Sequence, residues 1–433
     1  MWNRLKAARQ RNGRVVTNFL SLSTVQCANY LAPLIVLPYL FRVLGPSKYG
    51  LIEFARAINV YFVVLTDYGF SLSATREVSV HRDDPQRVSE VFSAVMLLKL
   101  LLVVFSFLML TILVLGVPRL RADWPVYFLS FGHVIGMWLF PIWLSQGLER
   151  MRHIAVLNVT TRLLAIVLIF ALVRDEGDYV YVPLLNSLGY ILAGAAGLVL
   201  ALRRFGVWFC IPSMDSLTRE FRDGWHLFLS KMATMLYTTS NAVILGLLTN
   251  NTFVAYYAAG DKIVRAVQGL QYPLSQAVFP HVGRLASQSK QAALEFVAVV
   301  MKILCGVMLL MSAALFVGAP YVARLLLGEQ FQAGVPVIRI LAFLPFITGL
   351  SNIFGIQIMA NFGLRKLLTR ILLAAGILSL VLAVSLATPW RHVGMAVVTL
   401  VTETFVTVAL YIGLRRNGLD VWRARTGGPW REV

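Results

Sequence analysis

Charged residues lie deep inside two apolar stretches of this chain, each of which is long enough to span a bilayer. The first stretch contains Arg56 and Asp67, and the second contains Asp261, Lys262 and Arg265. A charge at the centre of a bilayer costs about 2.5–3.5 kcal/mol on insertion scales, so it rarely occurs there without a partner or a task. The cations among these residues could bind an anion. The carboxylates could exchange an ion or hold the cations in place.

Helical spacing places further polar residues on the same faces. The polar stripe of the later stretch holds Asp261, Arg265, Gln268, Tyr272 and Ser275, and that of the earlier stretch holds Arg56, Asn59, Thr66 and Asp67. Pro273 removes a backbone hydrogen bond and is expected to bend the later helix. Because the stripes fall at corresponding places in the two halves of the chain, they predict one shared central cavity.

Structural roles are the alternatives for several of these residues. Asp261 and Arg265 are four residues apart, so they can form an ion pair that only fixes helix packing. Arg56 lies about 10 Å from the midplane at 1.5 Å per residue, so its side chain can extend to the interface instead. The same extension toward the cytoplasmic side is expected for Lys99, Lys231 and Lys302.

The elements that must position these residues are membrane helices. The chain is 58% hydrophobic and 14% charged, whereas soluble globular proteins carry about 25% charged residues. Recurring apolar runs predict an all-α polytopic membrane protein with twelve spans. The predicted spans run at roughly 17–41, 51–75, 91–116, 124–147, 154–173, 179–202, 225–248, 253–280, 296–318, 335–359, 371–388 and 393–414.

The net charge of +19 is largely explained by membrane topology. If the N-terminus is inside, 24 of the 39 Lys and Arg residues lie on the inner side and seven on the outer side. This bias predicts cytoplasmic N- and C-termini, and it removes the argument for a nucleic-acid partner. Within the spans there are eight basic residues and only four acidic ones. Such an excess requires a water-filled cavity or an anionic ligand.

Six spans fall on each side of the longest connection, so the fold is expected to be two six-helix bundles of the same topology around a central cavity. A shift of 204 residues brings the halves into weak register, for example Tyr68 onto Tyr272 and Ser71 onto Ser275. Repeats of this kind usually hold the transport site between them. The predicted parts are a basic arm at 1–16, a bundle at 17–202, a linker at 203–224, a bundle at 225–414 and a basic tail at 415–433.

Enzymatic motifs are missing from the sequence, which has no zinc spacing, nucleophile elbow or phosphate-cradling loop. We therefore expect a transporter without a metal or an organic cofactor. The loop after the second span also lacks the glycine expected of a major-facilitator sugar transporter.

Two groups of residues carry a family resemblance. Leu40–Gly50 (LFRVLGPSKYG) and Thr66–Phe70 (TDYGF) resemble the start of Wzx-type O-antigen and polysaccharide flippases, and Tyr256–Val264 (YYAAGDKIV) and Gln276–Pro280 (QAVFP) resemble their eighth span. These flippases belong to the multidrug/oligosaccharidyl-lipid/polysaccharide exporter superfamily. The resemblance implies that undecaprenyl-diphosphate-linked oligosaccharide crosses from the inner to the outer leaflet of the bacterial inner membrane by alternating access.

The resemblance also implies roles for individual residues. Arg56, Lys262 and Arg265 would engage the diphosphate or acidic sugars, and Asp67 and Asp261 would couple an ion or hold the cations. The polar neighbours Asn59, Gln268 and Tyr272 complete the predicted substrate site. Besides membrane lipids, the implied partners are a polysaccharide polymerase or a chain-length regulator.

Several functional alternatives stay open on the sequence. The cargo can instead be the lipid-linked peptidoglycan precursor, and a multidrug exporter or a membrane glycan polymerase is a more distant alternative. A drug exporter for cationic compounds favours an acidic cavity, whereas this chain has a basic excess. Transport can be coupled to protons or sodium, or it can be driven by the membrane potential alone.

Overall fold

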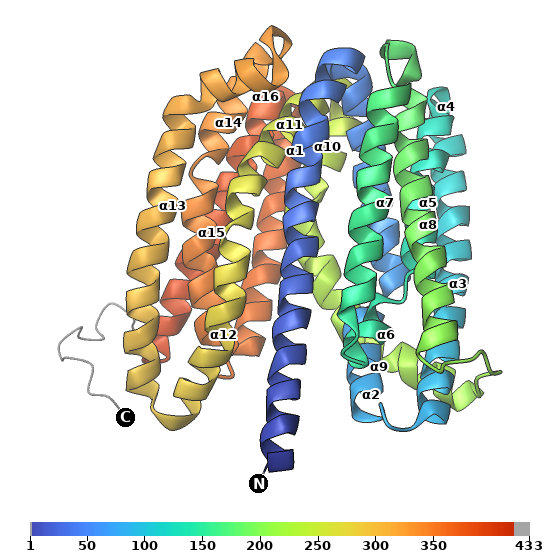
Figure 1. The fold of residues 1–433 in the computed structure, drawn as a ribbon. Helices are drawn as coiled ribbons and strands as arrows, with labels where there is room; N and C mark the ends of the chain where they lie inside the picture. The colour runs from blue at the N-terminus through green and yellow to red at the C-terminus, as the bar shows by residue number, and fades with distance from the viewer. Residues whose placement is uncertain (1, 420–433) are drawn as a thin grey trace. The chain divides into compact units, whose positions relative to one another are not determined.

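The computed structural model describes the backbone of residues 2–419, and the side chains of residues 32–419 except Arg152, His153, Pro273, Leu274 and Ala277. This part of the chain is helical and contains no strand (Figure 1). The predicted basic arm at 1–16 lies in the first helix, but its side chains lie outside the described residues, as does the predicted tail from residue 420 on.

Two compact units make up the chain, Met1–Met232 and Ala233–Val433. The division falls inside α9, which therefore contributes to both units. The helices that begin in unit 1 are α1 (Trp2–Asp67), α2 (Phe70–Val80), α3 (Pro85–Gly116), α4 (Pro118–Ala122), α5 (Trp124–Leu139), α6 (Ile142–Gly147), α7 (Met151–Leu172), η1 (Glu176–Val180), α8 (Tyr181–Arg204) and α9 (Met214–Thr238). Those of unit 2 are α10 (Ser240–Leu248), α11 (Asn251–Gly269), α12 (Gln271–Gln288), α13 (Lys290–Leu327), η2 (Glu329–Gly334), α14 (Val335–Leu341), α15 (Leu344–Asn352), η3 (Ile353–Met359) and α16 (Arg365–Arg416).

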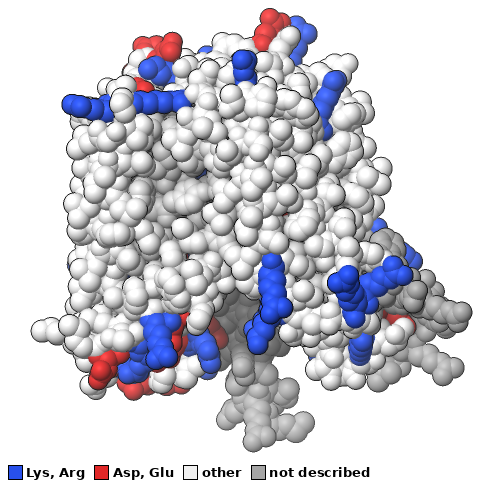
Figure 2. Space-filling view, turned by 180° about the vertical axis from the view of Figure 1, so that it is seen from behind, with Lys and Arg blue, Asp and Glu red and all other residues white. Residues whose placement is uncertain are grey.

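Apolar length identifies most of these helices as membrane spans. Eight stretches of the described residues are long and apolar enough to cross a membrane, and the last, Arg365–Arg416, is kinked at Arg391 between two predicted spans. The predicted spans at 225–248 and 253–280 are not among the eight, because α9, α11 and α12 carry polar and charged residues. Figure 2 shows charged side chains gathered toward the ends of the helices, with an uncharged band between them.

The first two predicted spans form one helix, α1, that changes direction at Gly45. This residue has φ 69° and ψ 170°, and Pro46 follows it. A positive φ suits glycine, and proline suits the first position of a new helix. The second span then stops at Asp67, because Tyr68 (φ 45°) and Gly69 (φ 87°) leave the helical conformation before α2 begins.

The interruption after Asp67 directs the ring of Tyr68 onto α9. Tyr68 is 3% exposed, and its ring stacks on Phe221 at 4.4 Å and on Phe228 at 5.0 Å between centroids. The predicted linker at 203–224 therefore contains the first turns of α9, and these turns pack within unit 1.

The eighth predicted span is interrupted at a matching place in unit 2. Helix α11 ends at Gly269 and α12 begins at Gln271. The break lies four residues before Pro273, as expected when proline cannot donate to the carbonyl of Gly269. With the shift of 204 residues, Tyr68 corresponds to position 272, so both halves interrupt the same span within about two residues.

Two glycines with positive φ provide a test of the packing at the first interruption. A Cβ added at Gly69 would lie 2.7 Å from the Gly224 carbonyl oxygen, whereas nothing lies within 4 Å of one added at Gly45. We expect Gly69→Ala to combine backbone strain of about 1–2 kcal/mol with an overpacking cost of about 1–3 kcal/mol. Gly45→Ala should cost the strain alone. Thermal unfolding of the purified variants measures the difference, and equal losses would contradict the close approach of α9.

Candidate functional site

A buried polar cluster surrounds Asp67 at the interrupted end of α1. Its Oδ2 atom accepts a hydrogen bond from Lys231 Nζ of α9 at 2.5 Å, and its Oδ1 atom accepts one from Ser71 Oγ. Lys99 of α3 is 4% exposed and lies close enough for its charge to act on Asp67. Its Nζ also donates to the carbonyl oxygen of Met137 at 3.2 Å. Two cations therefore compensate one carboxylate inside unit 1.

This cluster corrects the expectation that Lys99 and Lys231 extend to the cytoplasmic interface. Each lysine lies near the end of its span, but a carboxylate within reach stabilises the ammonium group more than partial hydration does. Lys302, in contrast, is exposed on α13. Asp67 and Lys231 are 164 positions apart in the chain, so no local pattern reveals their contact.

Arg56 is anchored along one edge of its guanidinium group. Its Nε and Nη2 atoms lie 2.9 and 2.8 Å from Glu53 Oε2, one turn earlier on α1. The Glu53 side chain is 5% exposed and also hydrogen-bonds to the buried Tyr49, whereas the Arg56 side chain is 54% exposed. Buried Glu53 thus orients Arg56 while the other guanidinium edge stays accessible.

Residues from three further helices of unit 1 lie near Arg56. The charges of Arg56 and Arg162 both act on the His133 ring, and Arg56 also interacts with Tyr190. The rings of His133 and Tyr190 are 4.0 Å apart between centroids. Only the packing of α5, α7 and α8 brings these residues to the same place.

In unit 2, Asp261 and Arg265 form the ion pair that their spacing predicts. Arg265 Nε donates to Asp261 Oδ2 at 2.6 Å, and Nη2 is 3.5 Å from the carbonyl oxygen of Thr238. The Arg265 side chain is 40% exposed and that of Asp261 16%. Glu403 of α16 adds a second, more distant negative charge. Arg265 Nη1 has no partner among the described residues, so this guanidinium is also anchored at one edge.

The rest of the predicted stripe on α11 and α12 contacts the neighbouring helix α15. Gln268 Nε2 donates weakly to Thr348 Oγ1 at 3.4 Å, and Ser275 Oγ donates to Asn352 Oδ1 at 2.9 Å. Tyr272 accepts a hydrogen bond from Gln276 within α12. Gln268 and Ser275 therefore contact α15 on either side of the helix break, whereas the hydrogen bond of Tyr272 lies within α12.

Two predicted site residues lie apart from these clusters. Asn59 is 1% exposed, and its amide donates to the carbonyl oxygens of Ala55 at 3.0 Å and Tyr127 at 3.3 Å. In this conformation it joins α1 to α5 and faces no open space. Lys262 is half-buried on α11, directly after Asp261. Its role as a substrate ligand stays a prediction.

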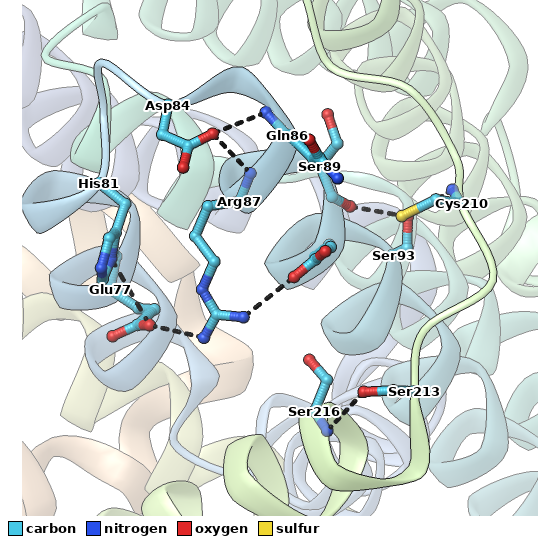
Figure 3. Close-up of polar contacts among 11 residues, drawn as sticks. Glu77, His81, Asp84, Gln86, Arg87, Ser89, Ser93, Cys210, Ser213 and Ser216 are labelled. Atoms are coloured by element: carbon cyan, nitrogen blue, oxygen red, sulfur yellow. Dashed lines mark hydrogen bonds and ion pairs between the residues drawn. The ribbon is translucent and has the colours of Figure 1, made fainter.

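The start of α9 lies near the corner between α2 and α3 (Figure 3). Arg87 bridges Glu77 and Glu90, with Nη2 and Nη1 each 3.0 Å from a carboxylate oxygen. The segment before α9 is attached to α3, because the amide of Cys210 donates to Ser93 Oγ at 2.9 Å. Asp84 caps α3 by accepting from two backbone amides, those of Gln86 and Arg87.

Glu220 of α9 is buried close to this corner. It is 3% exposed, and burial, with the negative charges of Glu77 and Asp223, raises its pKa to about 7. The positive charges of Arg87 and Arg219 act in the opposite direction. The first turns of α9 therefore carry a carboxyl group that titrates near neutral pH.

Interrupted helices with paired charges inside an apolar protein are the architecture of membrane transporters. Among the described residues, no group of three His, Cys, Asp or Glu side chains is placed to hold a metal ion. The chain is similar in fold to a multidrug resistance MATE family transporter in an inward-facing conformation, with a TM-score of 0.70 and 16% identity over 91% of this chain and 95% of that one. It is also similar to the lipid II flippase MurJ in an inward closed conformation, with a TM-score of 0.68 and 12% identity over 93% of this chain and 87% of that one. At these identities the likeness shows the fold alone: a multi-pass membrane protein with the twelve-helix, two-bundle fold of these transporters.

Sequence comparison adds the family. Residues 15–286 match the family model described as polysaccharide biosynthesis protein. The chain is 32% identical over 407 residues to the protein named "Putative O-antigen transporter" of Escherichia coli (strain K12), covering 93% of this chain and 97% of that protein. It is 27% identical over 392 residues to the protein of the same name from Shigella dysenteriae, covering 90% and 98%. The chain belongs to the polysaccharide biosynthesis protein family, and it is a membrane transporter rather than an enzyme.

The pair between Asp67 and Lys231 can be tested by a double-mutant cycle. We expect Lys231→Gln to lower stability by about 1–3 kcal/mol, because it leaves the Asp67 carboxylate without its ammonium partner. The loss is below that of a fully buried pair because the Lys231 side chain is 42% exposed. Adding Asp67→Asn should restore part of the loss, because the unpaired carboxylate is removed but the buried Lys99 then lacks its counter-charge. Thermal unfolding measures both variants, with Lys302→Gln as the control, and additive losses would contradict the pairing.

The pH dependence of stability should report on Glu220. Its pKa rises from 4.5 to about 7 in the folded protein, so the folded state holds an extra proton between these values. The stabilisation that this proton provides is complete below about pH 4.5 and is lost as the pH rises through about 7. Glu220→Gln should therefore unfold at a higher temperature than the wild type at pH 8, by an equivalent of at most about 3 kcal/mol. At pH 4.5 the two should coincide, and a difference independent of pH would refute the assignment.

Proposed function

We propose that this protein is a flippase that moves undecaprenyl-diphosphate-linked oligosaccharide, such as an O-antigen repeat unit, from the inner to the outer leaflet of the bacterial inner membrane. The membership of the polysaccharide biosynthesis family and the similarity to proteins named as O-antigen transporters support the class of cargo. The charge bias of the loops supports the orientation, with both termini in the cytoplasm.

The observation that carries the proposal is an ion pair of the same kind in each unit. Arg56 and Arg265 are each held along one guanidinium edge by a carboxylate on their own helix. A guanidinium presents five N–H donors in a planar fork that fits phosphate oxygens. An arginine whose orientation is already fixed loses less entropy when it binds an anion. A diphosphate, with its dense negative charge and many acceptor oxygens, is the matching ligand.

Electrostatics also supports export of an anion. Moving about two negative charges outward across a 100 mV inside-negative potential gains about 5 kcal/mol. In our proposal, the potential alone drives the diphosphate across by alternating access, and the polyprenyl chain stays in the lipid. The carboxylates Asp67 and Asp261 then hold cations in place and need not exchange an ion.

Substitutions at Arg265 distinguish the effect of its charge on transport from the effect of its hydrogen-bonding geometry. We expect Arg265→Gln to reduce translocation at least about thirtyfold, since losing a buried, charged hydrogen-bond partner typically costs 2–5 kcal/mol. Arg265→Lys should retain partial activity because it keeps the charge but not the fork. The measurement is the initial rate at which a labelled undecaprenyl-diphosphate glycan crosses proteoliposomes, normalised to inserted protein.

The matched control is Lys302→Gln, which removes a positive charge from an exposed position and should transport like the wild type. Wild-type rates for Arg265→Gln would show that the guanidinium does not bind the cargo.

The same vesicles distinguish the possible driving forces of transport. Translocation that persists at zero potential but stops without a pH or sodium gradient would replace the purely electrical mechanism with ion coupling.

A further inference from the structure

A groove of about 690 Å³ lies between the cytoplasmic halves of α7 and α8 in unit 1. It is lined by five apolar residues and by two arginines in the last turn of α8, namely Val156, Leu157, Ala196, Val199, Leu200, Arg203 and Arg204. Val156 and Val199 are 59% and 49% exposed. Among the described residues, no acidic one lines the groove. Its volume is within the range of about 300–1,000 Å³ typical of small-ligand sites.

The packing of the two helices explains why the groove opens at this end. At Gly189 an added Cβ would lie 3.3 Å from Ala165 Cβ, so the helices approach closely there. The groove begins about 10 Å further along α8, at Ala196. From there the groove is lined by Val156 and Leu157 of α7 and by Ala196, Val199 and Leu200 of α8.

The two arginines that line the groove have no carboxylate partner among the described residues. Arg203 and Arg204 are exposed in the last turn of α8. A third guanidinium lies beside them, because Arg150 Nη1 donates to the carbonyl oxygen of Arg204 at 3.1 Å and its guanidinium lies 5.5 Å from the centre of the Phe205 ring. Topogenic charge accounts for basic residues at this membrane face, but not for their position at the mouth of an apolar groove.

We propose that this groove binds an anionic phospholipid, with its phosphate on Arg203 and Arg204 and one acyl chain along Val156 and Val199. Basic pockets between membrane helices on the cytoplasmic side bind anionic lipid head groups. Arginine binds phosphate oxygens with paired hydrogen bonds, and the exposed aliphatic side chains provide the contact surface for the chain. The site lies within unit 1 and shares no residue with the clusters around Asp67 or Arg56.

The test measures phosphatidylglycerol bound to the full-length protein in detergent, by native mass spectrometry, against phosphatidylcholine as reference. Arg203→Gln combined with Arg204→Gln should weaken phosphatidylglycerol binding about thirtyfold, at roughly a fivefold factor for each arginine near an anionic lipid. Val199→Trp should also displace the lipid, because the indole fills the groove while the charges remain. Ala196→Leu fills the same space with a smaller change and serves as the second groove variant.

The control pair is Arg415→Gln with Arg416→Gln, which removes two adjacent exposed arginines from the last turn of α16. Its phosphatidylglycerol binding should equal that of the wild type. An equal loss in this control would reduce the effect to overall charge and overturn the site. Unchanged binding in both groove variants would show that the acyl chain does not enter. Displacement by undecaprenyl phosphate at the same concentration as by phosphatidylglycerol would assign the groove to the carrier lipid instead.

Discussion

The pairing of acidic residues inside the spans with basic ones is the constraint on which the rest of this structure depends. An unpaired charge in hydrocarbon costs several kcal/mol, and folding cannot proceed with many such costs. Glu53 with Arg56 and Asp261 with Arg265 satisfy this requirement within one helix. Asp67 with Lys231 satisfies it between two helices, so this pair fixes the position of α9 against α1.

The interrupted helices are subject to the same requirement, that polar groups inside the membrane find partners. A helix that stops inside a membrane leaves backbone carbonyl and amide groups that must find partners within the protein. At the break after Asp67, the Gly69 carbonyl oxygen accepts from the amides of Leu72 and Ser73. In unit 2 the chain passes from α11 to α12 at Leu270, whose amide donates to the carbonyl oxygen of Val267 at 3.2 Å. Non-helical backbone at membrane depth is tolerated only where protein or water surrounds it, and the buried Tyr68 at the first break meets this requirement.

Local patterns in the sequence predict the helices and the pairs within them, but not the contacts between distant segments. The spans are predictable because a long apolar run is sufficient to specify a membrane helix. The pair of Asp261 and Arg265 is predictable from its spacing of four residues. Lys231 and Lys99 were assigned wrongly because distance to the end of a span does not reveal a carboxylate from another helix. His133 and Tyr190 meet Arg56 only through the packing of three helices, and their residue types alone gave no signal. Asn59 was placed on the correct stripe, yet the stripe faces α5 at that point.

In the proposed function, the ion pairs allow an arginine both to bind an anion and to release it. A free arginine in a membrane cavity would hold a diphosphate tightly, and tight binding slows release. A carboxylate at one guanidinium edge lowers the net attraction while it fixes the direction of the remaining donors. Glu53, buried beside Arg56, and Asp261, beside Arg265, both have this effect, and Glu403 adds to it in unit 2. In the proposed function, the basic excess of the spans attracts the cargo over a distance, whereas each neutralised pair limits the affinity at the point of contact. A transporter needs this combination because its rate depends on leaving the site as much as on reaching it.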